Sequence, residues 1–198
     1  MAHKRPGKSG TRRGAAGAAG GDPALWARAA SFSARAHRGQ TRKDKLTPYA
    51  AHPARVAMTL ASLAGVTDAE VLAAAFLHDT LEDTTTDYDD LAERFGERVA
   101  RLVAALTKDG RLPEAEREEA YHAQLARAEP EARLIKLADV HDNLLDARES
   151  GDARRLEKTR GKARAALDLC SDDTLDATRA LAGRVRALLT ERARSRGR

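Results

Sequence analysis

Residues 71–83 read VLAAAFLHDTLED, an apolar run that ends with one histidine and three acids within six residues. Positions four apart share one face of an α-helix, so a helix through this stretch would place His78 above Glu82 and Asp79 above Asp83. The apolar run is typical of a buried helix, where charge is costly unless it is paired or bound to a metal. A solvated helix end with clustered acids is the alternative interpretation. The density of the four groups favours a metal or proton-transfer site.

The composition favours one domain built from closely packed helices. The chain has 198 residues, of which 42% are hydrophobic but only 4% aromatic, so its core must consist mainly of Ala, Leu and Val. No hydrophobic run approaches the roughly 20 residues that cross a bilayer, and no membrane partner is expected. The basic N-terminus lacks the apolar segment of a secretory signal, and the single cysteine, Cys170, excludes an intrachain disulfide framework. A cytoplasmic location is the simplest expectation.

The basic charge belongs to the two ends of the chain. Residues 1–22 carry five Lys/Arg and one acid, and residues 151–198 carry thirteen Lys/Arg and seven acids, within a net charge of +5. Contacts with nucleic-acid phosphates are one interpretation of such ends. Neither end has interleaved aromatic residues to stack on bases, so a solubilising tail and a basic helix face are favoured, and nucleic acid is not expected as a partner.

Caps and helix breakers predict an all-α fold, a single bundle of about nine helices. Asp22-Pro23 has an acidic cap and a proline at the first turn, and Thr67 to Glu70 reads as a capping box. Residues 1–21 are expected to form a disordered basic tail. A core over 22–150, with basic C-terminal helices over 151–198 packed on it, completes the predicted organisation. The expected helices are about 22–38, 52–65, 67–83, a short one ending at 95, 97–107, 113–129, 131–149, 152–169 and 172–194.

Two further segments supply groups of the same chemistry as the helix-end motif. His52 opens a helix just before Pro53, and an ordinary helix cap is the simpler interpretation of this residue taken alone. Asp139 lies on the inward side of the apolar helix around 134–138, where it needs either an Arg in a buried ion pair or a metal. Asn143 follows one turn later on the same face.

Together, these segments and the helix-end motif supply two imidazoles and two carboxylates from three predicted helices: His52, His78, Asp79 and Asp139. This donor set leaves room for water and suits manganese, iron or zinc in an open site rather than a closed structural site. A metal so held lowers the pKa of bound water and polarises a phosphoryl oxygen. Glu82 and Asp83 would then orient or deprotonate the water, so metal-assisted phosphoester hydrolysis is the predicted reaction class.

The order His…His-Asp…Asp resembles the signature of the HD-domain metal-dependent phosphohydrolases. The resemblance is closest to the hydrolase domain of RelA/SpoT enzymes, and it covers about residues 25–150. Five motifs in order carry it: AHRGQTRK with PY and HPARVA within 36–57, HDTLEDT at 78–84, FGERVA at 95–100, LTK at 106–108 and KLAD at 136–139. Only two basic helices are expected after residue 150, so the chain resembles the stand-alone small alarmone hydrolases, such as the metazoan SpoT homologue, and alarmone synthesis is not expected.

The resemblance implies manganese-dependent removal of the 3′-pyrophosphate from guanosine tetraphosphate and pentaphosphate, (p)ppGpp, which leaves GDP or GTP. The guanosine nucleotide would be the partner, and the core over 22–150 would be the HD domain. A planar Arg able to stack on a purine and a compact Lys suited to phosphate agree with the basic loop of this family. The roles implied are manganese ligation for His52, His78, Asp79 and Asp139, water activation for Glu82 and Asp83, and nucleotide contact for Arg42, Lys43 and Asn143.

The segment 140–146 departs from the family pattern. Val140 stands where Arg or Lys is usual, Asp142 where His or Tyr is usual, and Asp146 where a small hydroxyl residue often lies near the ribose. A carboxylate near a polyphosphate would repel it. An alternative is therefore an HD-type phosphohydrolase of another nucleotide, such as another pyrophosphorylated purine or NADPH. A non-catalytic nucleotide sensor or nucleic-acid-associated binder is the alternative from another class, and the oligomeric state, a homo-oligomer included, stays open.

Overall fold

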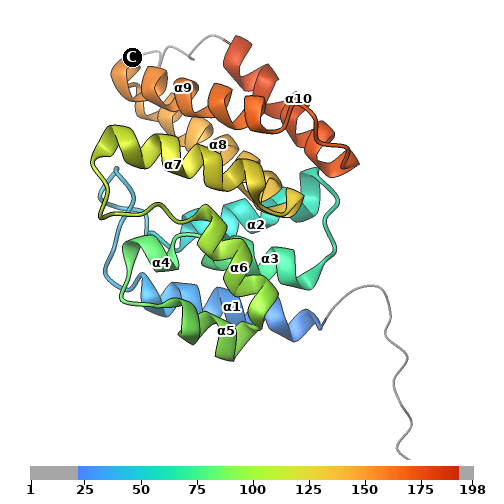
Figure 1. Cartoon of the computed structure of the whole chain (residues 1–198). Helices are drawn as coiled ribbons and strands as arrows, with labels where there is room; N and C mark the ends of the chain where they lie inside the picture. Colours follow the sequence, from blue (N-terminus) through green and yellow to red (C-terminus); the bar gives the residue numbers. More distant parts are fainter. Residues whose placement is uncertain (1–21, 192–198) are drawn as a thin grey trace, which may run out of the picture.

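The fold is an assembly of helices, seen in a computed structural model that describes residues 22–191 (Figure 1). Within this part of the chain the prediction of an all-α fold is confirmed, since the nearest approach to a strand is one isolated bridge between Thr41 and Pro48. None of these helices is both long and apolar enough to cross a bilayer. The helices are α1 (Pro23–Ala36), α2 (Ala51–Leu63), α3 (Ala69–Leu77), α4 (Thr80–Asp83), α5 (Tyr88–Phe95), α6 (Glu97–Leu106), α7 (Glu114–Arg127), α8 (Pro130–Ser150), α9 (Ala153–Leu169) and α10 (Asp176–Thr190).

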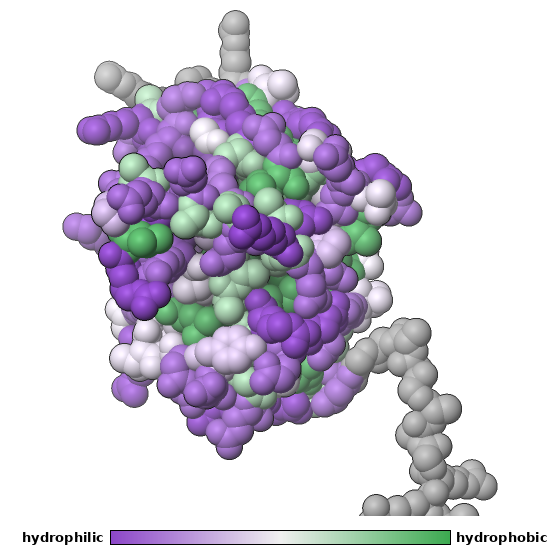
Figure 2. Space-filling model, viewed as in Figure 1, coloured by the Kyte–Doolittle hydropathy of each residue, from purple (hydrophilic) through white to green (hydrophobic). Residues whose placement is uncertain are grey.

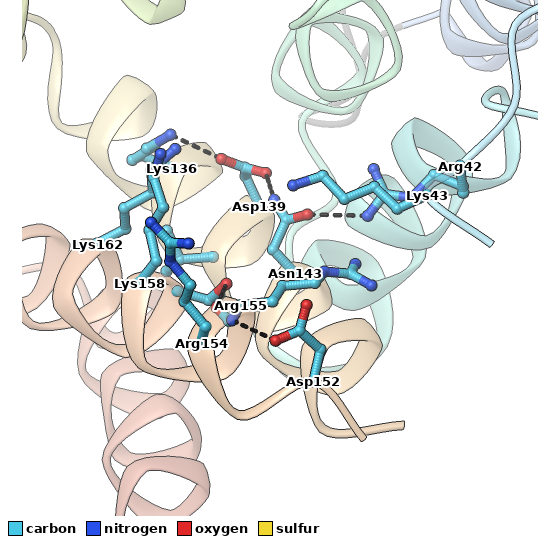
Figure 3. A pocket seen from close by; sticks show the side chains of 12 residues that line it. Arg42, Lys43, Lys136, Asp139, Asn143, Asp152, Arg154, Arg155, Lys158 and Lys162 are labelled. Atoms are coloured by element: carbon cyan, nitrogen blue, oxygen red, sulfur yellow. Dashed lines mark hydrogen bonds and ion pairs between the residues drawn. The ribbon is translucent and has the colours of Figure 1, made fainter. Parts of the chain in front are cut away.

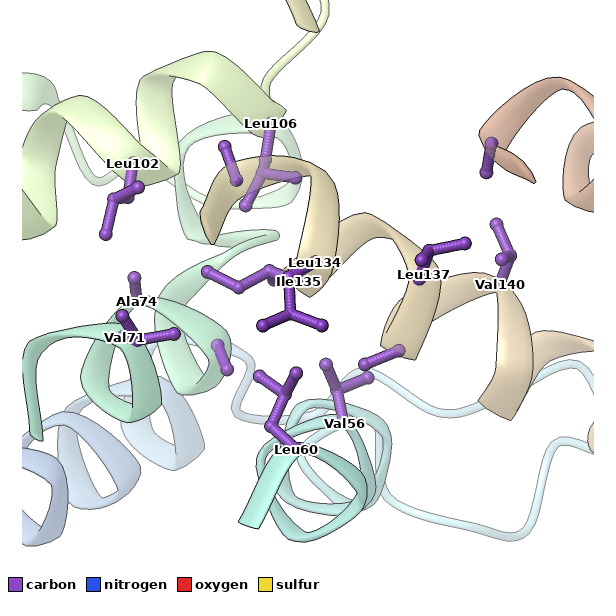
Figure 4. Close-up of a cluster of buried hydrophobic side chains, with 14 of the residues drawn as sticks. Val56, Leu60, Val71, Ala74, Leu102, Leu106, Leu134, Ile135, Leu137 and Val140 are labelled. Carbon is purple, nitrogen blue, oxygen red and sulfur yellow. The ribbon is translucent and has the colours of Figure 1, made fainter. Parts of the chain in front are cut away.

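Helix α3 forms the centre of the core and packs against α1, α2, α6 and α8. Its three consecutive alanines, 73–75, are fully buried, and their small side chains let the neighbouring helices approach closely. In Figure 4, Ile135 of α8 points toward Leu60 of α2, while Val71 of α3 lies near Leu102 of α6. The core is therefore made of aliphatic side chains, as the low aromatic content requires.

The helix expected to run through 67–83 is interrupted, which is why residues 22–191 hold ten helices where about nine were predicted for the chain. Helix α3 ends at Leu77, and the short α4 begins at Thr80. The Thr80 hydroxyl donates to the Leu77 carbonyl at 2.7 Å, and His78 Nδ1 lies 2.8 Å from the Ala75 carbonyl. These side chains satisfy carbonyls at the end of α3, so the chain can turn here without losing hydrogen bonds. The expectation of one unbroken helix was therefore wrong, but the Asp83 amide still donates to the Asp79 carbonyl at 2.9 Å, so Asp79 lies one helical turn before Asp83 as predicted.

Acidic side chains cap the starts of α1 and α3. The Asp22 carboxylate accepts from the Ala24 amide and precedes Pro23 at the first turn of α1. Helix α3 is capped by Asp68, which accepts from the Glu70 and Val71 amides, so the cap lies one residue later than the capping box predicted from Thr67 to Glu70. These local hydrogen bonds satisfy donors that a helix start leaves free, so the starts are readable from sequence.

Helices α9 and α10 pack against α8 on the side away from α1 and α5 (Figure 1). Helix α10 begins at Asp176, four residues later than expected, because residues 170–172 form a turn after α9 and residues 173–175 are irregular. Hydrophilic residues predominate on the face in Figure 2, and hydrophobic ones form small separate patches. The predicted tail over 1–21 and the end of the last predicted helix lie outside the described residues.

Candidate metal and nucleotide site

All nine residues singled out in the sequence line one cavity of about 250 Å³. They come from the loop between α1 and α2, the start of α2, the turn between α3 and α4, α4 itself, and the middle of α8. Residues about 100 positions apart in the chain are thereby brought together. The members are Arg42, Lys43, His52, His78, Asp79, Glu82, Asp83, Asp139 and Asn143.

Two imidazoles and two carboxylates converge at the floor of this cavity. His52 Nε2 lies 3.2 Å from Asp139 Oδ1 and 3.6 Å from Asp79 Oδ2. His78 Nε2 lies 3.1 Å from Asp79 Oδ2 and 4.0 Å from Asp139 Oδ1. One donor atom each of His52, His78 and Asp139 fits within 4.8 Å of the other two. The four groups thus offer nitrogen and oxygen atoms to a common point.

This donor set fits a divalent metal. Metal–ligand bonds of about 2.1 Å place neighbouring donors about 3 Å apart, close to the shorter separations seen here. The His78 Nε2 atom is buried and has no hydrogen-bond partner, although Asp79 Oδ2 is near, so it is oriented for something other than a hydrogen bond. A buried polar atom without a partner is costly, and a cation between the imidazoles and carboxylates would satisfy it.

The charges at the floor of the cavity are strongly coupled. Burial opposes protonation of His52, but hydrogen bonds to Asp139 and Asp142 prevail and raise its pKa to about 9. Burial likewise disfavours the ionised form of Asp139, yet Lys136 and His52 hold the pKa of its carboxyl well below the usual value. Without a metal, protons on the imidazoles therefore balance the carboxylates. A metal would have to displace those protons, which couples its binding to pH.

Asp139 is held in place by its own helix. Lys136 Nζ donates to Asp139 Oδ2 at 2.7 Å, and Asn143 Nδ2 donates to Oδ1 at 2.5 Å. Lys136 and Asn143 lie one turn before and one turn after Asp139, so all three share one face of α8. Asn143, predicted to contact the nucleoside, holds the side chain of Asp139, a predicted metal ligand.

Glu82 and Asp83 project from α4 at the exposed edge of the cavity. Desolvation within the cleft, with the nearby carboxylates of Asp79 and Asp83, raises the pKa of the Glu82 carboxyl. The Lys108 amide donates to Glu82 Oε2 at 3.2 Å and fixes its direction. A carboxylate with a raised pKa is a better proton acceptor, which suits a general base.

Tyr49 is a site residue whose role the sequence did not indicate. Its hydroxyl donates toward Asp79 Oδ2 at 2.7 Å and Asp83 Oδ2 at 3.1 Å. Gln40 fixes the same turn, because its Nε2 donates to the Asp83 carbonyl at 2.8 Å. Tyr49 belongs to the PY part of the first motif, three residues before His52. This position was the only indication of its role in the sequence. Its contacts depend on how the loop packs on α4.

A second, basic cavity of about 490 Å³ continues from the first, within the size range of small-molecule sites (Figure 3). Lys43 and Lys136 line both cavities, and α9 adds further cations that point into the space. These cations are Arg154, Arg155, Lys158 and Lys162, the last of which also lines the first cavity. A cluster of this sign attracts phosphate groups. Helix α9, whose basic character was interpreted as a solvated face, therefore borders the site.

The expected repulsion by Asp146 does not arise in this arrangement. Its Oδ2 atom accepts from Arg42 at 2.8 Å and from Arg155 at 2.9 Å, so its charge is neutralised. Arg42 also donates to Asn143 Oδ1 at 2.8 Å and lies over the Tyr49 ring, 5.6 Å from its centroid. The Arg42 side chain is 9% exposed. Its guanidinium edge is thus occupied within the protein.

The family model described as "HD domain" matches residues 29–169, most of the chain. The chain belongs to the HD domain family. The match of this HD domain protein extends through α9, beyond the boundary at 150 predicted for the core. The residues of the basic cavity on α9 thus fall inside the family's domain.

Three comparisons place this HD domain protein among its relatives. Human guanosine-3′,5′-bis(diphosphate) 3′-pyrophosphohydrolase MESH1 is 48% identical over 128 residues, 64% of this chain and 72% of that protein. A guanosine-3′,5′-bis(diphosphate) 3′-pyrophosphohydrolase from Aquifex aeolicus is 48% identical over 120 residues, 59% of this chain and 17% of that longer protein. The solved structure of a metazoan ortholog of SpoT that hydrolyzes ppGpp superposes with a TM-score of 0.74 and 32% identity, covering 83% of this chain and 93% of that one.

Proposed function

We propose that this protein is a manganese-dependent hydrolase that removes the 3′-pyrophosphate of guanosine tetraphosphate or pentaphosphate. The products would be GDP or GTP and pyrophosphate. The observation that carries this proposal is the junction of a two-His, two-carboxylate cluster with a cavity lined by six Lys and Arg side chains besides Arg42. The relatives named for this activity support it. We propose that the protein acts in the cytoplasm.

The two cavities suit the two ends of such a nucleotide. The 3′-pyrophosphate would lie above His52, His78, Asp79 and Asp139, which would hold the metal. The 5′ phosphates would lie toward Lys158 and Lys162 of α9, since these cations face that cavity (Figure 3). Four carboxylates line the first cavity, which we call the metal cavity. They repel phosphate groups and keep them out of this cavity unless a cation is bound there. The arrangement therefore orients the nucleotide by charge.

When bound, manganese lowers the pKa of water and offsets phosphoryl charge. The chain's own carboxylates do the rest. Glu82 accepts a proton from water, and Asp83, held by Tyr49, orients that water. The water oxygen forms a bond to the phosphorus attached to the ribose 3′ oxygen, and the bond from that phosphorus to the 3′ oxygen breaks. The 3′ oxygen then takes up the proton that Glu82 accepted from the water, while Lys136 keeps Asp139 ionised throughout.

The proposal that the base of the substrate is guanine goes further than the proposal of the reaction itself. Arg42 was predicted to contact the guanine, but its edge is occupied by Asn143 and Asp146. Arg42 can still stack on a purine through the planar face of its guanidinium, and such stacking distinguishes one base from another only weakly. This observation favours a second candidate, hydrolysis of another phosphorylated purine nucleotide such as NADPH by the same residues.

A nucleotide panel tests these candidates. Purified protein with Mn²⁺ should release pyrophosphate and GDP from ppGpp, and EDTA should abolish the reaction. NADPH and GTP should be hydrolysed far more slowly. Rapid release of phosphate from NADPH, with ppGpp untouched, would favour the second candidate. Binding of ppGpp without turnover at any metal would instead indicate a nucleotide sensor.

A further inference from the structure

The two imidazoles of the metal site are oriented in different ways. His78 Nδ1 lies 2.8 Å from the carbonyl of Ala75, one turn earlier in its own segment. His52 Nδ1 lies 2.7 Å from Oδ2 of Asp142, a residue 90 positions away on α8. One imidazole therefore faces a neutral backbone group, whereas the other faces a charged side chain from another helix.

Asp142 is itself fixed by Arg55. The Arg55 Nε atom donates to Asp142 Oδ1 at 2.5 Å, and its NH2 group donates to Oδ2 at 2.9 Å. The Asp142 side chain is only 4% exposed, while that of Arg55 is 40% exposed. A two-point bond to a guanidinium fixes the plane of a carboxylate and offsets the cost of burying it. Arg55 lies one turn after His52 on α2, so one turn of helix carries both the imidazole and the support of its partner.

This arrangement decides which nitrogen of His52 faces the cavity. Arg55 donates to both oxygens of Asp142, and a carboxylate paired in this way with a guanidinium accepts hydrogen bonds, so Oδ2 is placed to accept from His52 Nδ1. The hydrogen therefore sits on His52 Nδ1. In the neutral imidazole this leaves the Nε2 lone pair on the side of Asp79 and Asp139. That is the form of the ring that binds a metal.

We propose that Asp142, supported by Arg55, is a positioning residue for the metal. It sets the orientation and tautomer of His52 and makes Nε2 a stronger ligand than a backbone partner would. The inference rests on the metal site of the proposed function but not on its substrate. The competing explanation is an ion pair that merely joins α2 to α8.

Binding of Mn²⁺ alone to the metal-free protein separates these explanations. In Asp142→Asn the amide keeps the shape of the side chain but loses its charge, and its NH2 group can face His52 Nδ1 and favour the wrong tautomer. We expect calorimetry to show a Kd for Mn²⁺ raised about 10- to 100-fold. Asp173→Asn is the matched control, since Asp173 is also buried and pairs with an arginine, Arg133, at 3.7 Å in the turn before α10. Its Kd for Mn²⁺ should equal that of the wild type.

A second variant keeps the inference testable if Asp142→Asn fails to fold. Arg55→Gln removes the support from a half-exposed position and should raise the Kd for Mn²⁺ about threefold to tenfold, toward the lower end of effects from outer partners of a metal site. An unchanged Kd in a folded Asp142→Asn protein with a lowered unfolding temperature would overturn the proposal. An unchanged Kd in Arg55→Gln would do so if the first variant is unfolded. Wild-type protein that binds Mn²⁺ but leaves ppGpp intact would refute the proposed substrate alone.

Discussion

The metal cavity and the basic cavity adjoin, yet they are built in opposite ways. The imidazoles and Asp139 are buried and fixed by hydrogen bonds from named partners. Lys158 and Lys162 of the basic cavity lie exposed on one helix. A metal requires donors at set distances, whereas phosphate attraction falls off slowly with distance and tolerates mobile charges. The contrast teaches that catalysis should depend on single residues in the first cavity and on summed charge in the second.

The largest effect is expected from His78→Ala. Removing one of two imidazoles leaves the metal with an incomplete ligand set, so hydrolysis of ppGpp should fall at least about 1000-fold. Pyrophosphate release is the measurement. His122→Ala, on the exposed face of α7, is the control and should keep wild-type activity. Substantial activity in folded His78→Ala would remove the metal cavity from the mechanism.

Glu82→Gln should have the next largest effect. The amide cannot accept the water proton, so kcat should fall about 100- to 1000-fold while the Kd for Mn²⁺ stays within about threefold of wild type. Steady-state kinetics and calorimetry measure the two quantities. Glu93→Gln, an exposed change on α5, is the control. A parallel loss of metal affinity would instead make Glu82 a ligand.

Metal affinity should depend on pH over an unusual range. Because the metal-free His52 has its pKa raised to about 9, Mn²⁺ must displace its proton at neutral pH. The pKa of His78 is raised as well, so the Kd should fall by at least about tenfold per unit from pH 7 to pH 9, at least roughly 100-fold in all, and level off once both imidazoles are neutral. An ordinary imidazole would level off near pH 6.5. Calorimetry across this pH range measures the Kd. A Kd that stays constant above pH 7 would contradict the raised pKa of His52.

The smallest effect should come from the basic cavity. Lys158→Ala removes one of several cations, so KM for ppGpp should rise about tenfold or less, with kcat nearly unchanged. Added salt should raise the wild-type KM in the same direction. Arg164→Ala, on the same helix but outside the cavity lining, is the matched control. A large loss of kcat would show that the second cavity also demands fixed geometry.

Local patterns made the helices and the candidate ligands readable. Asp22 and Asp68 form caps with amides two or three residues away, and such bonds depend on sequence alone. The end of α3 was not predicted, because Thr80 and His78 had to be seen bonding to carbonyls that a continuous helix would use. The spacing of apolar residues predicts which face of a helix is buried. It does not reveal a turn after which the same residues remain buried.

The contacts of charged residues were the part that sequence left open. Asp142 and Asp146 were departures from a pattern, and their meaning came from Arg55, Arg42 and Arg155, which approach from other elements. The sequence shows that a carboxylate is present, whereas its partner depends on which helix packs beside it. Whether Asp146 repels or is neutralised could not follow from its own segment.

By itself, the sequence determined an all-α chain with two imidazoles and two carboxylates at positions typical of its family. Helix signals act over a few residues, and the motifs are contiguous. Only the tertiary structure decided that these groups share one cavity, that α9 supplies the neighbouring cations, and that His52 and His78 have unlike partners. The physical reason is that an electrostatic environment is set by distances in space, which packing of α2, α8 and α9 fixes.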